Sequence, residues 1–311
     1  MDIVTHGITG VLVSRALPTG NRGSMMAAGL IGALAPDLDG IAWFWDSMAA
    51  ITVHRTGTHS FIGGVVIALV VAGLVMAFRR QNFVRLFCFA YLGLLSHIGL
   101  DFLTPFGTAF LWPISDQRFA LAQHYIIDPI FSVIVLAFLI GSFRFKEKRE
   151  SFARIGFAAL ALYVLATGAH KWIAVSRWQA AIESNGIRLT RSEIIPLFPG
   201  PFRWLGVSET EAGFYQQSFN FYEPKLETPD FFSKVNGDFR DLERLREVQV
   251  FLSIARFPWK REVDDRGLRL VEYRELAFAD HPFGILGGPL SLRIWIDESN
   301  SVRKIEFGHR F

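Results

Sequence analysis

The chain has 311 residues, of which 51% are hydrophobic and 20% are charged, and its mean hydropathy is +0.29. It is too apolar for an average soluble domain and too charged to lie within a membrane throughout its length. The net charge of +3 comes with no basic stripe, which argues against nucleic-acid binding, and the single cysteine, Cys88, excludes an internal disulfide and any cysteine-based zinc site.

Long apolar runs in residues 1–175 predict an α-helical bundle embedded in the lipid bilayer. Residues 61–78 carry no charge and are long enough to cross it. Residues 25–45 are interrupted by Pro36-Asp37-Leu38-Asp39-Gly40, which predicts a kinked or partly unwound span. The other predicted segments are 3–17 (short or re-entrant), 83–103, 125–143 and 152–175. We therefore expect about five spans, one of them kinked or re-entrant.

Basic residues orient this bundle. They concentrate in three connections, around Arg15 and Arg22, at 79–85, and at 144–154. The positive-inside rule places these connections in the cytoplasm. Residues 46–60, residues 104–124 and everything after residue 175 are then expected outside.

Residues 176–311 are predicted to form a small, mainly β, extracytoplasmic domain. Apolar and polar residues alternate in 213–222, 268–276, 290–296 and 302–307, which is typical of strands. Residues 225–247 are predicted to be a loop followed by a helix, and we see no internal repeat. His281 and His309 in this domain are interpreted as ordinary surface residues.

Nine ionisable residues of the first domain fall on the outer side of the predicted membrane. Such residues are costly at membrane depth and should face the bundle interior and one another. His97 with Asp101, and His124 with Asp128, have a spacing of four, which directs two side chains from one helical face. The predicted metal ligands are His6, Asp37, Asp39, His54, His59, His97, Asp101, His124 and Asp128.

Imidazole and carboxylate groups without thiolate favour zinc or manganese. Arg55, within His54-Arg55-Thr56-Gly57-Thr58-His59-Ser60, adds a cation of the type that commonly binds phosphate. Simpler interpretations stay open at this point. His6 suits an interfacial side chain, Asp37 and Asp39 suit helix caps, and His97 with Asp101 suits a proton relay or a structural hydrogen bond.

Four motifs in order resemble the YdjM-type family of bacterial inner-membrane proteins, described as metal-dependent hydrolases, some under LexA control. The motifs are Thr5-His6, Pro36-Asp37-Leu38-Asp39, His54-Arg55-x-x-Thr58-His59-Ser60 and Ser96-His97-x-x-Leu100-Asp101-x-x-Thr104-Pro105-x-Gly107. The resemblance covers residues 1–175. It implies a multi-pass protein of the bacterial inner membrane with metal-dependent activity.

The ligand order is also similar, more weakly, to the zinc-dependent phospholipase C and P1 nuclease group. That order maps onto His6, Asp37 or Asp39, His59, His97 with Asp101, and His124 with Asp128. The chain lacks that group's further histidine after His-x-x-x-Asp and its N-terminal tryptophan. These departures reduce the expected number of metal ions to one or two.

Together these features predict a membrane-bound hydrolase that cleaves a phosphoester in a lipid or lipid-linked substrate with metal-activated water. Asp37 or Asp39, whichever is not a ligand, would be the general base, and Arg55 would hold phosphate charge. The alternatives are a non-enzymatic metal-binding protein or transporter and an intramembrane metalloprotease, the latter disfavoured because no His-Glu-x-x-His occurs. The sequence indicates no particular protein partner.

Overall fold

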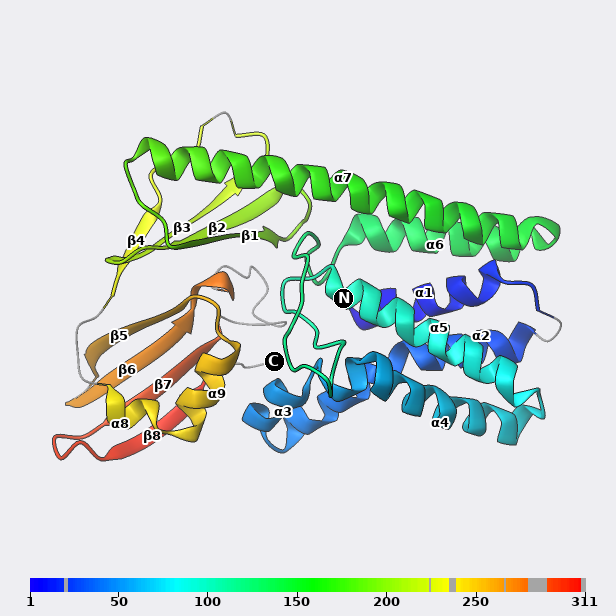
Figure 1. Ribbon diagram of the computed structural model, residues 1–311, viewed down its shortest axis with the longest axis horizontal. Helices are drawn as coiled ribbons and strands as arrows, with labels where there is room; N and C mark the ends of the chain where they lie inside the picture. Colours follow the sequence, from blue (N-terminus) through cyan, green and yellow to red (C-terminus); the bar gives the residue numbers. More distant parts are fainter. Residues whose placement is uncertain (20–21, 224, 235–238, 266, 279–289, 309–311) are drawn as a thin grey trace. The chain divides into compact units, whose positions relative to one another are not determined.

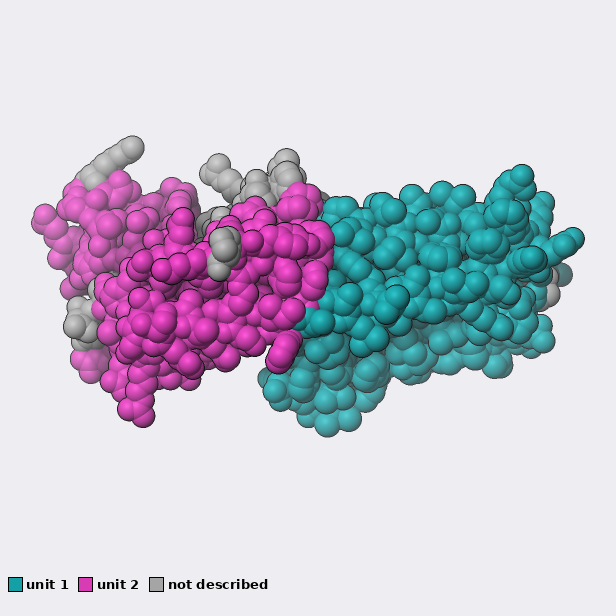
Figure 2. Space-filling model, turned by 90° about the horizontal axis from the view of Figure 1, so that it is seen from above, with its two compact units in different colours: residues 1–169 teal, residues 170–311 magenta. Residues whose placement is uncertain are grey.

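A computed structural model describes residues 1–311 except 20–21, 224, 235–238, 266, 279–289 and 309–311. It divides the chain into two compact units, unit 1 (Met1–Ala169) and unit 2 (His170–Phe311), which Figure 2 shows in different colours. His281 and His309, interpreted above as surface residues, lie outside the described residues.

Unit 1 is a helical bundle (Figure 1). It contains α1 (Ile3–Ala16), α2 (Arg22–Leu34), η1 (Pro36–Phe44), α3 (Ser47–Val53), η2 (Gly57–His59), α4 (Phe61–Arg79), α5 (Phe83–Phe102), α6 (Pro129–Arg144) and η3 (Lys146–Lys148), and the first part of α7 (Arg149–Ser184). Among the described residues, three helical segments can cross a membrane by length and composition: α4, α5 and Lys146–Ser184. A fourth is added if α2 and the start of η1, bent by 42° at their break, form one span. The predicted helical region is thus confirmed with three to four candidate spans, whereas a fifth stays a prediction.

Side-chain caps determine where several helices begin. Ser60 accepts a hydrogen bond from the Gly63 amide at the start of α4, and Asp128 accepts one from Phe131 at the start of α6. Pro129 occupies the first turn of α6, and a residue before proline avoids helical geometry. The predicted helix from residue 125 is therefore wrong at its start. His124 and Asp128 precede α6 and do not share a helical face.

Small residues bring α2 and α5 into backbone contact. A Cβ atom added at Gly32 would lie 2.1 Å from the Ala90 carbonyl oxygen, and one added at Gly93 would lie 2.2 Å from that of Gly29. Side chains larger than hydrogen would force the helices apart, as at other small-residue helix contacts in membranes. This contact matters for the metal centre, because Ala33 and His97 lie one turn further along the same two helices.

Unit 2 consists of two four-stranded antiparallel sheets (Figure 1). The first has the order β1–β2–β3–β4 and the second the order β5–β6–β7–β8, both simple meanders. The strands are β1 (Arg191–Leu197), β2 (Arg203–Glu209), β3 (Gly213–Asn220), β4 (Asp230–Ser233), β5 (Pro258–Asp265), β6 (Leu268–Glu275), β7 (Ser291–Ile296) and β8 (Val302–Phe307). The end of α7 packs on the first sheet, with Trp178 buried against Trp204 and Phe219. The short helices α8 (Arg240–Glu243) and α9 (Arg246–Ile254) precede the second sheet, and η4 (Leu276–Phe278) follows β6.

The two-sheet structure confirms the predicted mainly β character of the C-terminal region. β3, β6, β7 and β8 fall within the four predicted segments. The sequence prediction missed β1, β2 and β5, and residues 225–247 contain β4 as well as helix. Residue 175, the predicted domain boundary, lies inside α7. Each sheet follows a helix and has the same strand order, a similarity of arrangement that the sequence did not indicate.

A buried carboxylate, Glu272, is held by arginines on the second sheet. Its oxygens lie 2.6 Å from Arg261 Nε and 3.0 Å from Arg293 Nε. Burial alone would raise the pKa of Glu272, but the ion pairs with Arg293, Arg274 and Arg261 outweigh burial and hold this pKa below its ordinary value of 4.5. Glu272 therefore stabilises unit 2 as a charged group.

Candidate metal centre

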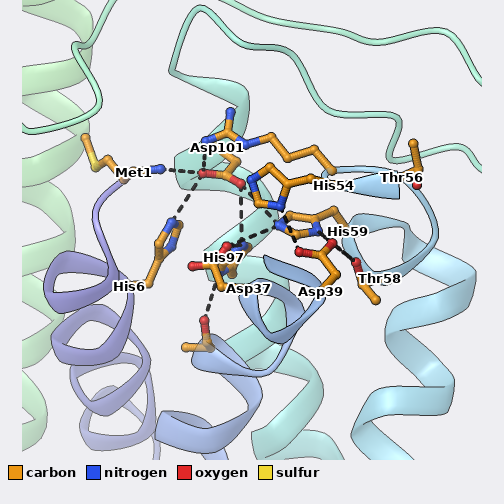
Figure 3. Close-up of polar contacts among 12 residues, drawn as sticks. Met1, His6, Asp37, Asp39, His54, Thr56, Thr58, His59, His97 and Asp101 are labelled. Atoms are coloured by element: carbon orange, nitrogen blue, oxygen red, sulfur yellow. Dashed lines mark hydrogen bonds and ion pairs between the residues drawn. The ribbon is translucent and has the colours of Figure 1, made fainter. Parts of the chain in front are cut away.

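Three elements of unit 1 bring histidines and aspartates together (Figure 3). The 3-10 helix η1 carries Asp37 and Asp39 in its first turn, and η2 ends at His59. The last turns of α5 carry His97 and Asp101, whose spacing of four places both on one helical face. Residues far apart in the sequence thus meet where two apolar helices begin or end.

Four side-chain atoms surround one point. His59 Nε2 lies 3.5 Å from both Asp37 Oδ1 and Asp101 Oδ2, and His97 Nε2 lies 3.6 Å and 3.4 Å from the same two oxygens. A tetrahedral zinc ion with bonds of about 2.0–2.2 Å separates its ligand atoms by about 3.3–3.6 Å. These four distances therefore have the spacing of a tetrahedral ligand set.

The unsatisfied atoms of this set fit a metal ion better than a hydrogen-bond network. His59, His97 and Asp101 are fully buried, and within the described part of the chain His59 Nε2, His97 Nε2 and Asp101 Oδ2 have no hydrogen-bond partner. Leaving such groups buried and unpaired is costly, so native structures rarely do so without a ligand or water. Asp37, with its side chain 22% exposed, forms the more open side of the set.

Hydrogen bonds on the opposite ring atoms orient both histidines. His97 Nδ1 is 2.7 Å from the carbonyl oxygen of Ala33 and must donate to it, which leaves Nε2 unprotonated in the neutral ring. His59 Nδ1 lies 3.0 Å from the Thr58 hydroxyl oxygen, to which it must donate because that hydroxyl donates to Asp39, and 3.3 Å from Asp39 Oδ2. Metal-binding histidines commonly donate their second ring N–H to a carbonyl or carboxylate in this way. Both rings therefore present a lone pair toward Asp37 and Asp101.

Asp39 has a different environment from Asp37. Its Oδ1 is 2.7 Å from His54 Nδ1, and its Oδ2 accepts a 2.6 Å hydrogen bond from the Thr58 hydroxyl. Asp39, His54 and His59 also form a second metal-compatible group, within 4.8 Å. This second group shares His59 and would use the ring atom that faces Asp39, so the two groups compete for one imidazole.

The second oxygen of Asp101, Oδ1, is held by cationic and imidazole groups. Arg55 Nη2 donates to it at 2.9 Å, while Arg55 Nη1 donates to Thr104 Oγ1 at 2.8 Å. His6 Nε2 lies 3.2 Å from Oδ1, and the amino group of Met1 also contacts it. The His6 ring stacks on His97 with centroids 3.7 Å apart. His6 is therefore adjacent to the four-atom set but outside it.

Arg55 is a buried anchor in this arrangement. Its backbone has φ of 61°, a left-handed conformation that is uncommon for a residue other than glycine, and its side chain is 6% exposed. Both terminal guanidinium nitrogens are used by Asp101 and Thr104. This geometry fixes Asp101 so that Oδ2 remains directed at His59 and His97.

His124 and Asp128 form a separate buried network. His124 Nδ1 is 2.8 Å from Asp128 Oδ2, and His124 Nε2 is 2.9 Å from the Thr167 hydroxyl. The Tyr163 hydroxyl lies within 3.0 Å of both Asp128 oxygens. Both ring nitrogens of His124 are thus engaged, and neither His124 nor Asp128 belongs to a metal-compatible group of the described residues.

Sequence reasoning missed the groups that support the centre. Thr58 lies in the His54–Ser60 motif, so the sequence indicated that it matters. The sequence did not indicate that its hydroxyl donates a hydrogen bond to Asp39. Thr104 is likewise in a quoted motif. The Ala33 carbonyl carries no sequence signal, since a backbone acceptor within an apolar helix is unremarkable by itself.

Comparison with known proteins gives a family match and similar relatives. Residues 1–174 match the family described as YdjM inner membrane protein. Inner membrane protein YbcI of Escherichia coli (strain K12) is 30% identical over 125 residues, which cover 38% of this chain and 70% of that protein. Uncharacterized protein YfhP of Bacillus subtilis (strain 168) is 26% identical over 146 residues, 44% of this chain and 45% of the relative. No solved structure matches.

Proposed function

The chain belongs to the YdjM inner membrane protein family, and from this premise we propose that it is a membrane-bound metal-dependent hydrolase. The observation that carries the proposal is the set of Asp37, His59, His97 and Asp101, whose facing atoms have tetrahedral spacing. Its three buried atoms, on His59, His97 and Asp101, lack other partners among the described residues. Nitrogen and oxygen ligands without sulfur favour zinc, with manganese as the alternative. A bound divalent ion supplies Lewis acidity toward a phosphoryl oxygen and lowers the pKa of water.

One or two ions are proposed. The four-atom set holds the first. Asp37, Asp39 and Asp101 place three carboxylates here against the two cationic groups of Arg55 and the Met1 amino terminus, so a divalent ion compensates the remaining negative charge.

The structure supports a division of roles between the two η1 aspartates. Asp37 Oδ1 faces the lone pairs of His59 and His97, so we assign it as ligand. Asp39 accepts hydrogen bonds from Thr58 and His54 and is linked to His59 through the Thr58 hydroxyl, so we assign it to orientation of these rings. With Nδ1 of His54 held by Asp39, Nε2 is the ring atom placed to accept a proton from water. Arg55 positions Asp101 and adds positive charge for a phosphate group.

The proposed substrate is a phosphoester in a lipid or lipid-linked molecule. The centre is built from residues at the ends of apolar helices in a family of inner-membrane proteins, so lipids are the molecules it meets at highest concentration. Arginine beside a metal centre suits phosphate chemistry.

The experiment combines metal analysis with phosphate release. Purified wild-type protein is expected to hold one to two zinc or manganese ions and to release phosphate from vesicles containing phospholipids or lipid-linked phosphates. His97→Ala and Asp101→Ala are each expected to lose metal and activity. His170, which stacks on Phe221 in unit 2, provides the control His170→Ala with unchanged metal content. Metal retained in the double variant of His97 and Asp101, or full metal without hydrolysis of any phosphoester, contradicts the proposal.

We also propose that unit 2 lies outside the cytoplasm. Arg79, Arg80 and Arg85 lie around the α4–α5 connection, and basic residues from Arg144 to Arg154 surround the α6–α7 connection. Both connections are expected in the cytoplasm. Reporters fused after residues 80 and 148 should therefore report a cytoplasmic location, and a reporter fused after residue 311 a periplasmic one. A cytoplasmic location for the reporter after residue 311 would contradict this placement of unit 2.

A further inference from the structure

The lengths of α4 and α5 fix the depth of the metal centre. α4 has 19 residues, which at about 1.5 Å per residue corresponds to about 28 Å, close to the thickness of the hydrocarbon core. Its last residues, Arg79 and the cap Arg80, belong at one membrane boundary. His59, two residues before α4, and Asp101, in the last turn of α5, therefore lie at the other boundary.

Exposed apolar side chains occur on the segments that carry or adjoin this centre. Leu38, between the two η1 aspartates, is 64% exposed, and Trp45, directly after η1, is 79% exposed. On the segment after α5, Ile114 is 80% exposed. We define the apolar rim as Leu38, Ile41, Trp45, Trp112 and Ile114.

The two parts of the rim are tied to the centre. The Trp112 ring lies 3.5 Å from the position of a Cβ atom built on Gly57, the first residue of η2, so it packs over the segment that carries His59. Arg118 donates to the carbonyl oxygen of His54 at 2.9 Å and thereby holds the segment after α5 against the end of α3. Asp37 and His54 are partly accessible polar groups of the centre, each with a side chain 22% exposed.

We propose that the apolar rim inserts into the lipid headgroup layer, so that ligands reach the centre from the membrane. Large exposed apolar groups beside a polar site indicate an interaction surface, and tryptophan favours the boundary between lipid and water. Because the rim lies at the membrane depth fixed by the lengths of α4 and α5, phospholipid is the molecule that contacts it. Resting on the proposed function, this inference makes the substrate an amphiphile whose phosphoester lies at headgroup level.

Depth-dependent quenching tests the rim without requiring catalysis. The free cysteine is first removed by Cys88→Ala, and single cysteines are then introduced by Trp45→Cys and Ile114→Cys for labelling with bimane. Val70→Cys, at the middle of α4 and 57% exposed, provides the deep control, and Val302→Cys, on β8 and 38% exposed, the control outside the bundle. Labelled proteins are reconstituted in phosphatidylcholine vesicles brominated near the carbonyl or near the chain end, and aqueous iodide is the competing quencher.

The outcomes are distinct. Labels at residues 45 and 114 should be quenched more by bromine near the carbonyl than near the chain end, the label at residue 70 should show the reverse, and the label at residue 302 should respond only to iodide. Rim labels quenched by iodide alone, or shielded from both quenchers because a second copy covers them, overturn the inference. If the expected depth profile is found but no phosphoester is hydrolysed, the proposed function fails and the membrane-inserted rim stands.

Discussion

Replacing Asp39 by asparagine separates the two η1 aspartates. The Asp39 carboxylate is within hydrogen-bonding distance of the Thr58 hydroxyl and His54 Nδ1 and lies 3.3 Å from His59 Nδ1. Asparagine keeps one acceptor oxygen and replaces the other with an amide donor. It therefore cannot accept from both sides, and His59 loses the carboxylate that directs its Nε2 lone pair toward Asp37 and Asp101.

We expect a moderate loss of zinc affinity, because Asp39 acts by orienting His59 and is not itself a ligand. Loss of a partner that orients a metal ligand typically weakens metal affinity by about 10–100-fold. This corresponds to about 1.4–2.8 kcal/mol of binding free energy. Zinc affinity, measured by competition with a chromophoric chelator at fixed pH, should therefore fall within this range for Asp39→Asn, while one to two ions per chain are still bound at saturation.

Asp37→Asn is the matched control, because it makes the same chemical change two residues away. Since Asp37 Oδ1 faces both His59 and His97, its loss should lower the stoichiometry and weaken affinity by more than a hundredfold. If Asp39→Asn removes the ion as completely as Asp37→Asn does, Asp39 is itself a ligand. If Asp39→Asn leaves zinc affinity unchanged, orientation of His59 by Asp39 contributes nothing to metal binding.

Three further outcomes are expected. Arg55→Lys should weaken zinc affinity by roughly tenfold to a hundredfold, because losing one charge-assisted hydrogen bond to Asp101 or Thr104 costs about 1.5–3 kcal/mol; an unchanged affinity in the chelator competition would refute its positioning role. His124→Ala should leave metal content unchanged but lower the free energy of unfolding by about 1–3 kcal/mol, since it leaves buried groups unpaired; metal loss at unchanged thermal stability would make His124 a ligand. Because the folded-state pKa of Glu272 is lowered, the stability that its charge contributes is present above the ordinary pKa of 4.5 and is lost as pH falls through the folded-state pKa. Thermal unfolding followed by tryptophan fluorescence should therefore show a smaller loss of stability at acid pH for Glu272→Gln than for the wild type. Identical pH profiles of stability for the two proteins would exclude this linkage.

The sequence was most informative where structure depends on local pattern. Residues 61–78 predicted α4 because an uninterrupted apolar run of that length has few alternatives in a bilayer. Alternation predicted β6 to β8, but β2 is buried along most of its length and so shows no alternation. β5 was missed because its charged residues resemble a polar loop. The start of α6 was misplaced because the cap by Asp128 was not considered.

In the candidate site, too, the sequence predicted the features that depend on local pattern and missed those that depend on tertiary contacts. The spacing of His97 and Asp101 is local, and the helix brings their facing atoms to 3.4 Å. Placing Asp37 and His59 against them depends on contacts among helices that no short pattern encodes. The environment that distinguishes Asp39 from Asp37 is likewise visible only in three dimensions, as is the pairing of His124 with Thr167.

The glycine contact between α2 and α5 has a consequence for the order of events during biosynthesis. The Ala33 carbonyl and His97 are 64 residues apart, yet they meet because Gly29 and Gly93 let the two helix backbones touch one turn away. A nascent chain that has released Asp37 and His59 still lacks half of the four-atom set. α5 must enter the bilayer and pack against α2 before the set closes, so loading of an ion onto all four atoms follows insertion of α5 rather than accompanying the emergence of the first ligands.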